Sequence, residues 1–294
     1  MKYVITNEFT GKTIKEFLRM QGVSGGLLKK LKKIENGITV NAFHQNVTYC
    51  LQENDILELL SEDVSSDTNE YLEPVDLPID IIYEDENITV VNKPSNMPTH
   101  QSINNHNNTL ANALKFRYRE RPYVFRAVNR LDKDTSGVVI TANNRYHSSL
   151  LSKLIQSGKV LKQYIAVVEG ELVGQGAINA PIDRVGTSII KRMVREDGES
   201  ALTEYKVLLS SKEASVVLVT PRTGRTHQIR VHMEHIGHPI IGDALYGKES
   251  SYTKRQALHC VKMELGEYGS FVAPIPNDIK ELIKVYFDNE EVFF

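Results

Sequence analysis

The series of short apolar runs in the second half of the chain constrains the fold more than any other feature. Runs with the spacing of β-strands occur at 137–141, 164–168, 201–209, 215–220 and 259–264. Helical spacing of apolar residues appears at 110–118 and 147–156. Many strands with few helices between them are typical of an α+β domain, whereas a βαβ repeat would alternate the two. We therefore predict an α+β fold with a mixed, largely antiparallel central sheet.

The first 60 residues carry a different pattern. Two segments have helical spacing and two short runs alternate like strands, at 12–20, 25–34, 38–40 and 55–59. Asn36-Gly37, between the second helical segment and the first strand, marks a turn. These elements predict a small α/β unit over residues 1–60.

Residues 61–75 separate this unit from the rest of the chain. They are polar, acidic and poor in apolar side chains. Such a segment cannot bury enough surface to order itself. We predict an acidic linker at 61–75 and a second domain over residues 76–294.

The net charge of -2 conceals an uneven distribution of charge. Residues 1–33 hold eight Lys and Arg against two acids, and residues 87–234 hold 21 against 12. Between them, residues 61–86 hold ten acids and no base. A short acidic stretch therefore masks two basic blocks, and these blocks would meet a polyanion.

Four lysines lie along the second helical segment, on faces that its leucines leave free. They are Lys29, Lys30, Lys32 and Lys33. Such a run is often a solvated helix face, but it is also the pattern of a nucleic-acid contact. The residues alone leave both interpretations open.

The two cysteines, Cys50 and Cys260, lie far apart and have no metal-binding spacing. We expect both to be reduced, in a cytoplasmic protein. No run of 18 or more apolar residues appears, so we expect no membrane span.

Three polar, glycine-containing segments, at 92–100, 129–137 and 221–247, stand between or beside apolar strands. Loops of this kind often carry functional residues, although a single one can equally be a turn. Within the third segment, we expect Gly242-Asp243 to shape a turn.

The chain resembles the RluA-type pseudouridine synthases, the family that modifies large-subunit ribosomal RNA, over about residues 76–294. Residues 130–137 read Arg-Leu-Asp-Lys-Asp-Thr-Ser-Gly, and 162–170 begin Lys-Gln-Tyr. Residues 223–232 read Thr-Gly-Arg-Thr-His-Gln-Ile-Arg-Val-His, and 237–243 read Gly-His-Pro-Ile-Ile-Gly-Asp. The first 60 residues resemble an S4-type RNA-binding unit, which favours RNA contact by the lysines.

The resemblance implies that Asp132 isomerises uridine in structured RNA as the nucleophile, without metal or cofactor. It leaves open whether the carboxylate attacks the ribose, attacks the base or stabilises an eliminated glycal. A carboxyl group has a pKa of about 3.9 in water, which burial raises and a nearby guanidinium lowers. The family partner that would keep the carboxylate charged is Arg230, with Arg225 as second choice. Tyr164 matches the tyrosine that stacks on the uracil and moves a proton.

The target base must leave its stack to reach a buried carboxylate. By the same resemblance, Arg130 fills the space that the base vacates, because a guanidinium can both stack and donate hydrogen bonds. The preceding residue is Asn129, where family members commonly have histidine. Asparagine can donate and accept hydrogen bonds but cannot titrate, so this position puts the details of base flipping or substrate choice in doubt.

Other functions remain as alternatives. The chain could be an RNA-binding or ribosome-assembly protein with dispensable catalysis, or its substrate could be transfer RNA instead of ribosomal RNA. Four histidines, at 227, 232, 235 and 238, invite a metallohydrolase, but their spacing fits no common zinc motif. Ser136 with His227 would suggest a hydrolase triad, but Ser136 lacks the usual flanking glycines. We expect a monomer that binds RNA.

Overall fold

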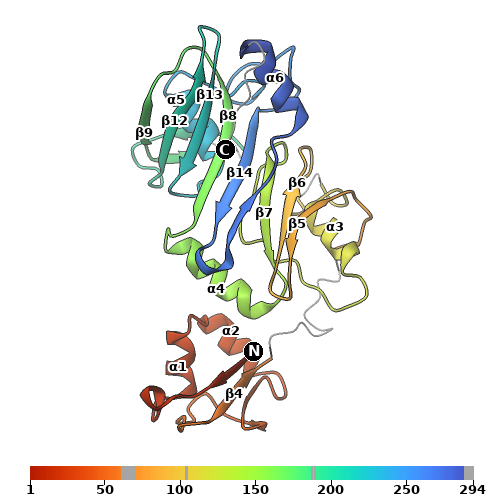
Figure 1. Ribbon diagram of the computed structural model, residues 1–294, viewed down its shortest axis with the longest axis vertical. Helices are drawn as coiled ribbons and strands as arrows, with labels where there is room; N and C mark the ends of the chain where they lie inside the picture. The colour runs from red at the N-terminus through yellow and green to blue at the C-terminus, as the bar shows by residue number, and fades with distance from the viewer. Residues whose placement is uncertain (61–70, 103–104, 187, 189, 288–294) are drawn as a thin grey trace.

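The computed structural model describes residues 1–60, 71–102, 105–186, 188 and 190–287. These residues form a small N-terminal unit and a larger α+β unit stacked end to end along the long axis (Figure 1). Each unit has a sheet and a buried core of its own.

The N-terminal unit packs two helices on a four-stranded sheet. The strands are β1 (Lys2–Val4), β4 (Ile56–Leu59), β2 (Ile38–Val40) and β3 (Phe43–His44), in that order across the sheet. After a 3-10 turn, η1 (Asn7–Phe9), come α1 (Ile14–Met20) and α2 (Gly25–Leu31). Thr13 and Glu16 form a capping box that fixes the start of α1. The two predicted helices are present, although α2 ends three residues earlier than its apolar spacing indicated.

The larger unit is built on a mixed sheet of nine strands. Their order is β5-β6-β7-β14-β8-β13-β12-β9, and β15 pairs with β14. The bounds are β5 (Asp80–Glu84), β6 (Ile88–Lys93), β7 (Ser136–Ala142), β8 (Leu161–Glu169), β9 (Gln175–Asn179), β12 (Leu202–Ser210), β13 (Ala214–Pro221), β14 (Leu258–Glu264) and β15 (Ser270–Val272). β7 and β14 are parallel, and the other neighbouring pairs are antiparallel. The predicted mixed, largely antiparallel sheet is confirmed.

The parallel contact between β7 and β14 depends on Gly137. This residue has φ +113°, and a Cβ atom there would lie 2.2 Å from the carbonyl oxygen of Cys260. Only glycine allows two backbones to approach so closely in this conformation. The close approach fixes the loop before β7, which carries Asp132, against the centre of the sheet.

Four α-helices and one hairpin complete the larger unit. The helices are α3 (Leu110–Arg117), α4 (Arg145–Gln156), α5 (Gln228–His235) and α6 (Asn277–Phe287). The hairpin pairs β10 (Ile182–Arg184) with β11 (Arg192–Val194), and a 3-10 turn, η3 (Gly266–Tyr268), precedes β15. The sequence pattern indicated α3 and α4 but not α5, whose buried face includes Gln228, Arg230 and His232. Polar side chains on the buried face conceal the apolar period that marks a helix.

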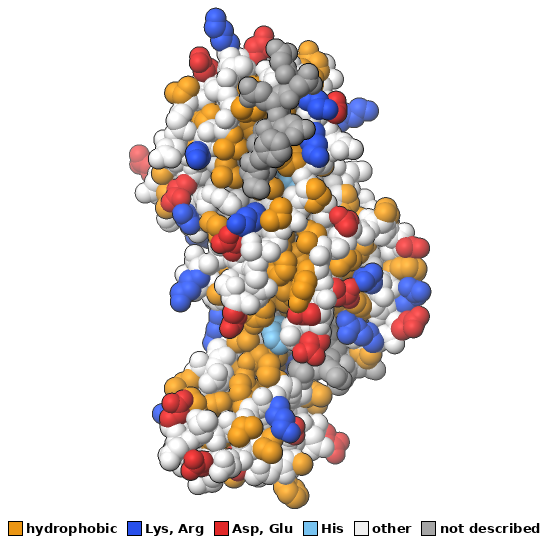
Figure 2. Space-filling model, viewed as in Figure 1, with side chains coloured by type: hydrophobic (Ala, Val, Ile, Leu, Met, Phe, Trp, Pro, Cys, Tyr) orange, Lys and Arg blue, Asp and Glu red, His pale blue; other side chains and the backbone are white. Residues whose placement is uncertain are grey.

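Helix α4 joins the two units. Tyr146, in its first turn, is buried in the core of the N-terminal unit, and its hydroxyl group is hydrogen-bonded to that of Tyr3. The backbone N–H of Ser24 donates to Ser149 Oγ at 2.9 Å. Figure 1 shows α4 facing α1 and α2, and Figure 2 shows apolar side chains at the neck between the units.

Most of the predicted acidic linker, residues 61–70, lies outside the described residues. The remainder is attached to the larger unit. Leu72 is buried, the carbonyl group of Glu73 accepts from Asn112 Nδ2 at 2.8 Å, and the N–H of Val75 donates to the Asn112 carbonyl at 3.2 Å. The chain is therefore held on α3 before the first strand of the large sheet begins.

Candidate active site

Asp132 lies in a braced turn before β7. The N–H of Thr135 donates to the Asp132 carbonyl at 3.2 Å, and Thr99 Oγ1 donates to the Leu131 carbonyl at 2.9 Å. Asn129 uses both ends of its amide on β7, because Nδ2 donates to the Val138 carbonyl and Oδ1 accepts from the N–H of Ile140. Asn129 therefore stabilises the turn through hydrogen bonds to β7. The sequence analysis had grouped it with the base-flipping residues.

A fully buried lysine, Lys93 at the end of β6, is hydrogen-bonded to the same turn. Its ammonium group donates to the carbonyl groups of Pro94, Met97 and Lys133, at 2.8, 2.7 and 3.1 Å. Three acceptors around one ammonium group satisfy all of its donors. Lys93 therefore ties the loop after β6 to the Asp132 turn.

We predict that Lys93→Met changes how stability depends on pH. Burial lowers the pKa of Lys93 to about 7, although Asp134 and Asp132 oppose the shift. Between this value and the ordinary 10.5, the unfolded chain binds more protons than the folded chain. Lys93 therefore contributes stability that rises with pH, by about 1.4 kcal/mol per pH unit in this window. Urea unfolding of both proteins across the window measures the contribution.

The comparison for this prediction is Lys212→Met, which changes an exposed lysine in the turn between β12 and β13. Its unfolding free energy should run parallel to that of the wild type as the pH rises. The unfolding free energy of the wild type minus that of Lys93→Met should instead increase with pH. A constant difference would show that Lys93 keeps its proton throughout, and the prediction would be wrong.

The carboxylate of Asp132 is held by Arg230, from α5. Arg230 Nη1 donates to Asp132 Oδ2 at 3.0 Å, as the resemblance predicted. The Arg230 side chain is 9% exposed and that of Asp132 is 29% exposed. Asp132 lines the cavity, and within the described residues its side chain accepts no other hydrogen bond. Arg225, the second choice of partner, instead binds the carboxylate of Glu199 and the Ser200 carbonyl.

The arginine is itself anchored by Asp243, a carboxylate that the sequence analysis assigned to a turn and not to the site. Asp243, 1% exposed, accepts from Arg230 Nε at 2.6 Å and Nη2 at 2.8 Å. Burial opposes the charge of Arg230, but Asp243 first and then Asp132 raise its pKa. Gly242 precedes this aspartate with φ +79°, and a Cβ atom there would lie 2.3 Å from the carbonyl oxygen of Arg255. Asp243 also accepts from the N–H of Tyr246, so the predicted turn is present and has a second use.

Tyr246 and His227 complete the surroundings of the arginine. The guanidinium of Arg230 lies 5.0 Å from the centre of the Tyr246 ring, and the Tyr246 hydroxyl group is hydrogen-bonded to His227 Nδ1 at 2.9 Å. His227 Nε2 is 3.8 Å from Asp132 Oδ2. Burial lowers the pKa of His227 despite the opposing charge of Asp132.

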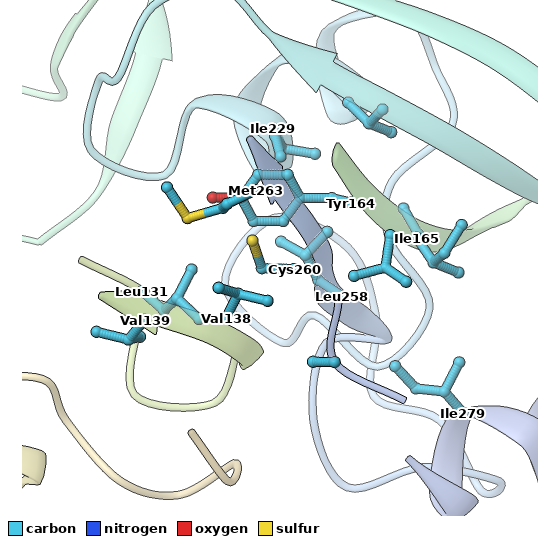
Figure 3. Close-up of a cluster of buried hydrophobic side chains, with 14 of the residues drawn as sticks. Leu131, Val138, Val139, Tyr164, Ile165, Ile229, Leu258, Cys260, Met263 and Ile279 are labelled. Carbon is cyan, nitrogen blue, oxygen red and sulfur yellow. The ribbon is translucent and has the colours of Figure 1, made fainter. Parts of the chain in front are cut away.

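Asp132, His227 and Arg230 line a cavity of about 680 Å³. Tyr164, from β8, lines it and is 8% exposed. Figure 3 shows the Tyr164 ring between Ile229 of α5 and Cys260 of β14. Burial raises the pKa of Tyr164 well above its ordinary value. Tyr164 therefore presents a flat, uncharged ring on which a base can stack.

Two predicted RNA-contacting arginines lie at the cavity, and four predicted lysines do not. Arg130 and Arg225 both line the cavity, and the side chain of Arg130 is exposed. The lysines at 29, 30, 32 and 33 are exposed on α2 and the turn after it, in the N-terminal unit. They can contact an RNA only outside the cavity.

The RNA pseudouridylate synthase family matches residues 87–235, a segment that contains Asp132, Tyr164 and Arg230. The chain belongs to this family. It is 36% identical over 280 residues to the uncharacterized RNA pseudouridine synthase YjbO of Bacillus subtilis, covering 92% of this chain and 98% of YjbO. It is also 38% identical to ribosomal large subunit pseudouridine synthase D of Xanthomonas campestris, over 77% of this chain and 75% of that protein.

Solved structures agree with this assignment. Human RNA pseudouridylate synthase domain containing 1 has a TM-score of 0.58 and 27% identity, over 68% of this chain and 83% of that chain. Human RNA pseudouridylate synthase domain containing 4, at 22% identity and a TM-score of 0.56, shares the fold. As a pseudouridine synthase, the protein is an isomerase that acts on RNA.

The histidines of this pseudouridine synthase have separate places. His232 is hydrogen-bonded to Thr203 Oγ1 and to the Ala180 carbonyl, and His238 to the Glu169 carbonyl. No group of three or more His, Cys, Asp or Glu in the described part of the chain is arranged to hold a metal ion. Ser136 is hydrogen-bonded to His259 instead of His227, which removes the basis for a hydrolase triad.

None of the helices in the described ranges is long and apolar enough to cross a membrane.

Proposed function

We propose that the protein converts uridine to pseudouridine in large-subunit ribosomal RNA, with Asp132 as the catalytic carboxylate. The observation that carries the proposal is the chain of contacts from Asp243 through Arg230 to Asp132. It holds one oxygen of Asp132 at the wall of the cavity. Ribosomal RNA is the named substrate of the Xanthomonas relative.

The reaction needs little beyond a carboxylate and a shaped cavity. The N1–C1′ bond of uridine breaks, the uracil turns, and a C5–C1′ bond forms. C5 loses its hydrogen and N1 gains one, so the nucleotide keeps its composition and no oxidant or reductant is consumed. Arg230 pairs with Asp132 at the cavity wall, and the Tyr164 ring offers a face for the uracil.

Base flipping accounts for the residues at the cavity mouth. A base that leaves its stack costs a few kcal/mol, and a planar guanidinium that enters the gap lowers this cost. Arg130, exposed and two positions before Asp132, is placed to enter that gap. Asn129 holds the backbone from which Arg130 projects, through its two hydrogen bonds to β7.

The N-terminal unit extends the contact with RNA. We propose that it is an S4-type RNA-binding unit, with the lysines of residues 29–33 on phosphate groups. We also propose that the protein is a cytoplasmic monomer. Cys50 and Cys260 form no disulfide bond, as is usual in the cytoplasm.

Charge neutralisation tests the N-terminal unit. A variant with all four lysines of residues 29–33 changed to glutamine should bind RNA more weakly and with a flatter salt dependence. Each phosphate group that a lysine no longer neutralises lowers the slope of log K against log salt by about 0.7–0.9, so the full change is roughly 3. Filter binding at several salt concentrations measures the slope, and a slope equal to that of the wild type would identify a solvated helix face.

The substrate is tested by mapping pseudouridines with carbodiimide in total RNA from a strain that lacks the gene. The loss of defined modified positions in large-subunit ribosomal RNA is expected. Loss in transfer RNA instead would move the substrate to the alternative class. An unchanged map, together with no tritium release from 5-labelled uridine RNA, would favour an assembly protein with dispensable catalysis.

A further inference from the structure

Helix α4 connects the N-terminal unit to the active-site cavity. At its beginning, Tyr146 is buried among N-terminal residues and Ser149 is hydrogen-bonded to Ser24, the N-cap of α2. In its last turn, Ile155 lines the cavity. The helix has 12 residues, a length of about 18 Å. One rigid element therefore sets the distance between α2 and Asp132.

The segment that contains α4 is free of acidic residues. Residues 143–168 hold four Lys and Arg and no Asp or Glu. Lys153 and Lys159 are exposed, and neither forms an ion pair with any described residue. The carboxylates that influence α4 act on its first turn, where Asp85 and Glu86 face His147, and Glu267 faces Tyr146.

Lys162 continues this series into the cavity. It lines the wall, and its Nζ lies 3.8 Å from where a side chain on Gly224 would begin. No carboxylate in the described ranges pairs with it. Burial lowers its pKa, because a partly desolvated ammonium group without an anion is costly. An anion brought by a ligand would relieve that cost.

The lysines of α2 extend the series in the other direction. Lys153 lies one turn after Ser149, and residues four apart on a helix are neighbours. Ser149 holds the start of α2, which carries Lys29 and Lys30 in its last turn. A favourable interaction with the C-terminal end of α4 would account for Lys153 alone. It does not account for Lys159 in the following turn or for Lys162 in the cavity wall.

We propose that five lysines form one continuous surface, the lysine track, which binds the phosphate backbone of the RNA segment that delivers the target uridine. The members are Lys29, Lys30, Lys153, Lys159 and Lys162. The proposal rests on the proposed function, because it takes the RNA substrate as the occupant. A polyanion is the ligand that matches a series of cations carried by α2, by α4 and the turn after it, and by β8.

The test compares Lys153→Gln/Lys159→Gln with Lys212→Gln/Lys280→Gln, in which two exposed lysines of the β12–β13 turn and α6 are changed. The probe is an unmodified large-subunit ribosomal RNA transcript from the source strain. For the first variant, the slope of log K against log salt should fall by about 1.4–1.8. KM should rise roughly tenfold with kcat within twofold, since the track binds RNA outside the reacting atoms. The control pair should match the wild type.

Crosslinking tests whether the track is continuous. A photoreactive group is attached to Lys29→Cys or Lys153→Cys, in a Cys50→Ser background because Cys50 is exposed. Both labels should mark one RNA segment that includes the target uridine, with the label at position 153 nearer to it. Marks on unrelated segments, or a salt slope for Lys153→Gln/Lys159→Gln equal to that of the control pair, would overturn the proposal.

The lysine track and the proposed function fail in different ways. Tritium release by the wild type on the transcript tests the function, whereas the salt slope and the crosslinks need no turnover. A slope that depends on Lys153 and Lys159, without tritium release, would support the track and contradict the function. Normal turnover with a salt slope that does not depend on Lys153 and Lys159 would support the function and contradict the lysine track.

Discussion

Asp132→Asn should abolish isomerisation, with a loss in the rate of tritium release of at least ~10⁴-fold. The amide has nearly the shape of the carboxylate but carries no charge, so it cannot act as the nucleophile or stabilise a cationic ribose. RNA affinity should stay within a few-fold of the wild type, because Asp132 lies in the cavity and contributes no positive charge to phosphate binding. Single-turnover assays on 5-labelled uridine RNA separate the two effects.

The matched control is Asp80→Asn, the same chemical change at an exposed position on β5, outside the cavity. It should retain full turnover. Substantial tritium release by Asp132→Asn under the same conditions would contradict the assignment of Asp132 as the catalytic carboxylate. A large loss of RNA affinity would show instead that the substitution disturbs the binding surface.

Asp243→Asn should damage both stability and activity. Removal of one partner from a buried ion pair costs about 3–5 kcal/mol, because a buried charge is left without its counterion. Arg230 would lose its bidentate anchor and retain Asp132 as its one carboxylate partner in the described part of the chain. A small displacement of a catalytic group can cost ~10²-fold in rate. Urea unfolding and single-turnover rates measure the two effects.

A second substitution identifies the cause of these effects. In Asp243→Asn/Arg230→Met, the unpaired cation is absent, so part of the unfolding free energy should return while activity stays low. An equal stability of the single and double variants would contradict a role of Asp243 through Arg230. Full activity in Asp243→Asn would show that Asp132 needs no anchored partner.

Five strands of the large sheet, β7, β8, β12, β13 and β14, could be read from the sequence because their apolar side chains alternate or run without interruption. The contact between Arg230 and Asp132 was implied by resemblance, across 98 positions of sequence. Spacing alone could not have supplied it. Helix α5 escaped notice because the residues that build the site, Gln228 and Arg230, occupy its buried face. A chain that uses its core for chemistry loses the pattern that reveals its secondary structure.

The roles of Lys93, which was not singled out, and of Asp243, which was assigned only to a turn, were not predicted for a related reason. Each is a charged residue beside a turn signal, Pro94 in one case and Gly242 in the other, and such residues are usually exposed. Their burial follows from tertiary contacts that bring together segments far apart in the chain. The sequence feature that could have indicated a role for these two residues was their place in the polar segments next to the apolar strands.

The burial of Tyr146 in the N-terminal core has a consequence for folding. A helix of the larger unit supplies an aromatic side chain that the smaller unit needs to fill its interior. Separation of the two units would therefore expose Tyr146 on one side and leave a gap on the other. Thermal melting should then proceed as one cooperative transition, and a chimera with a foreign N-terminal unit would have to match the surface of α4.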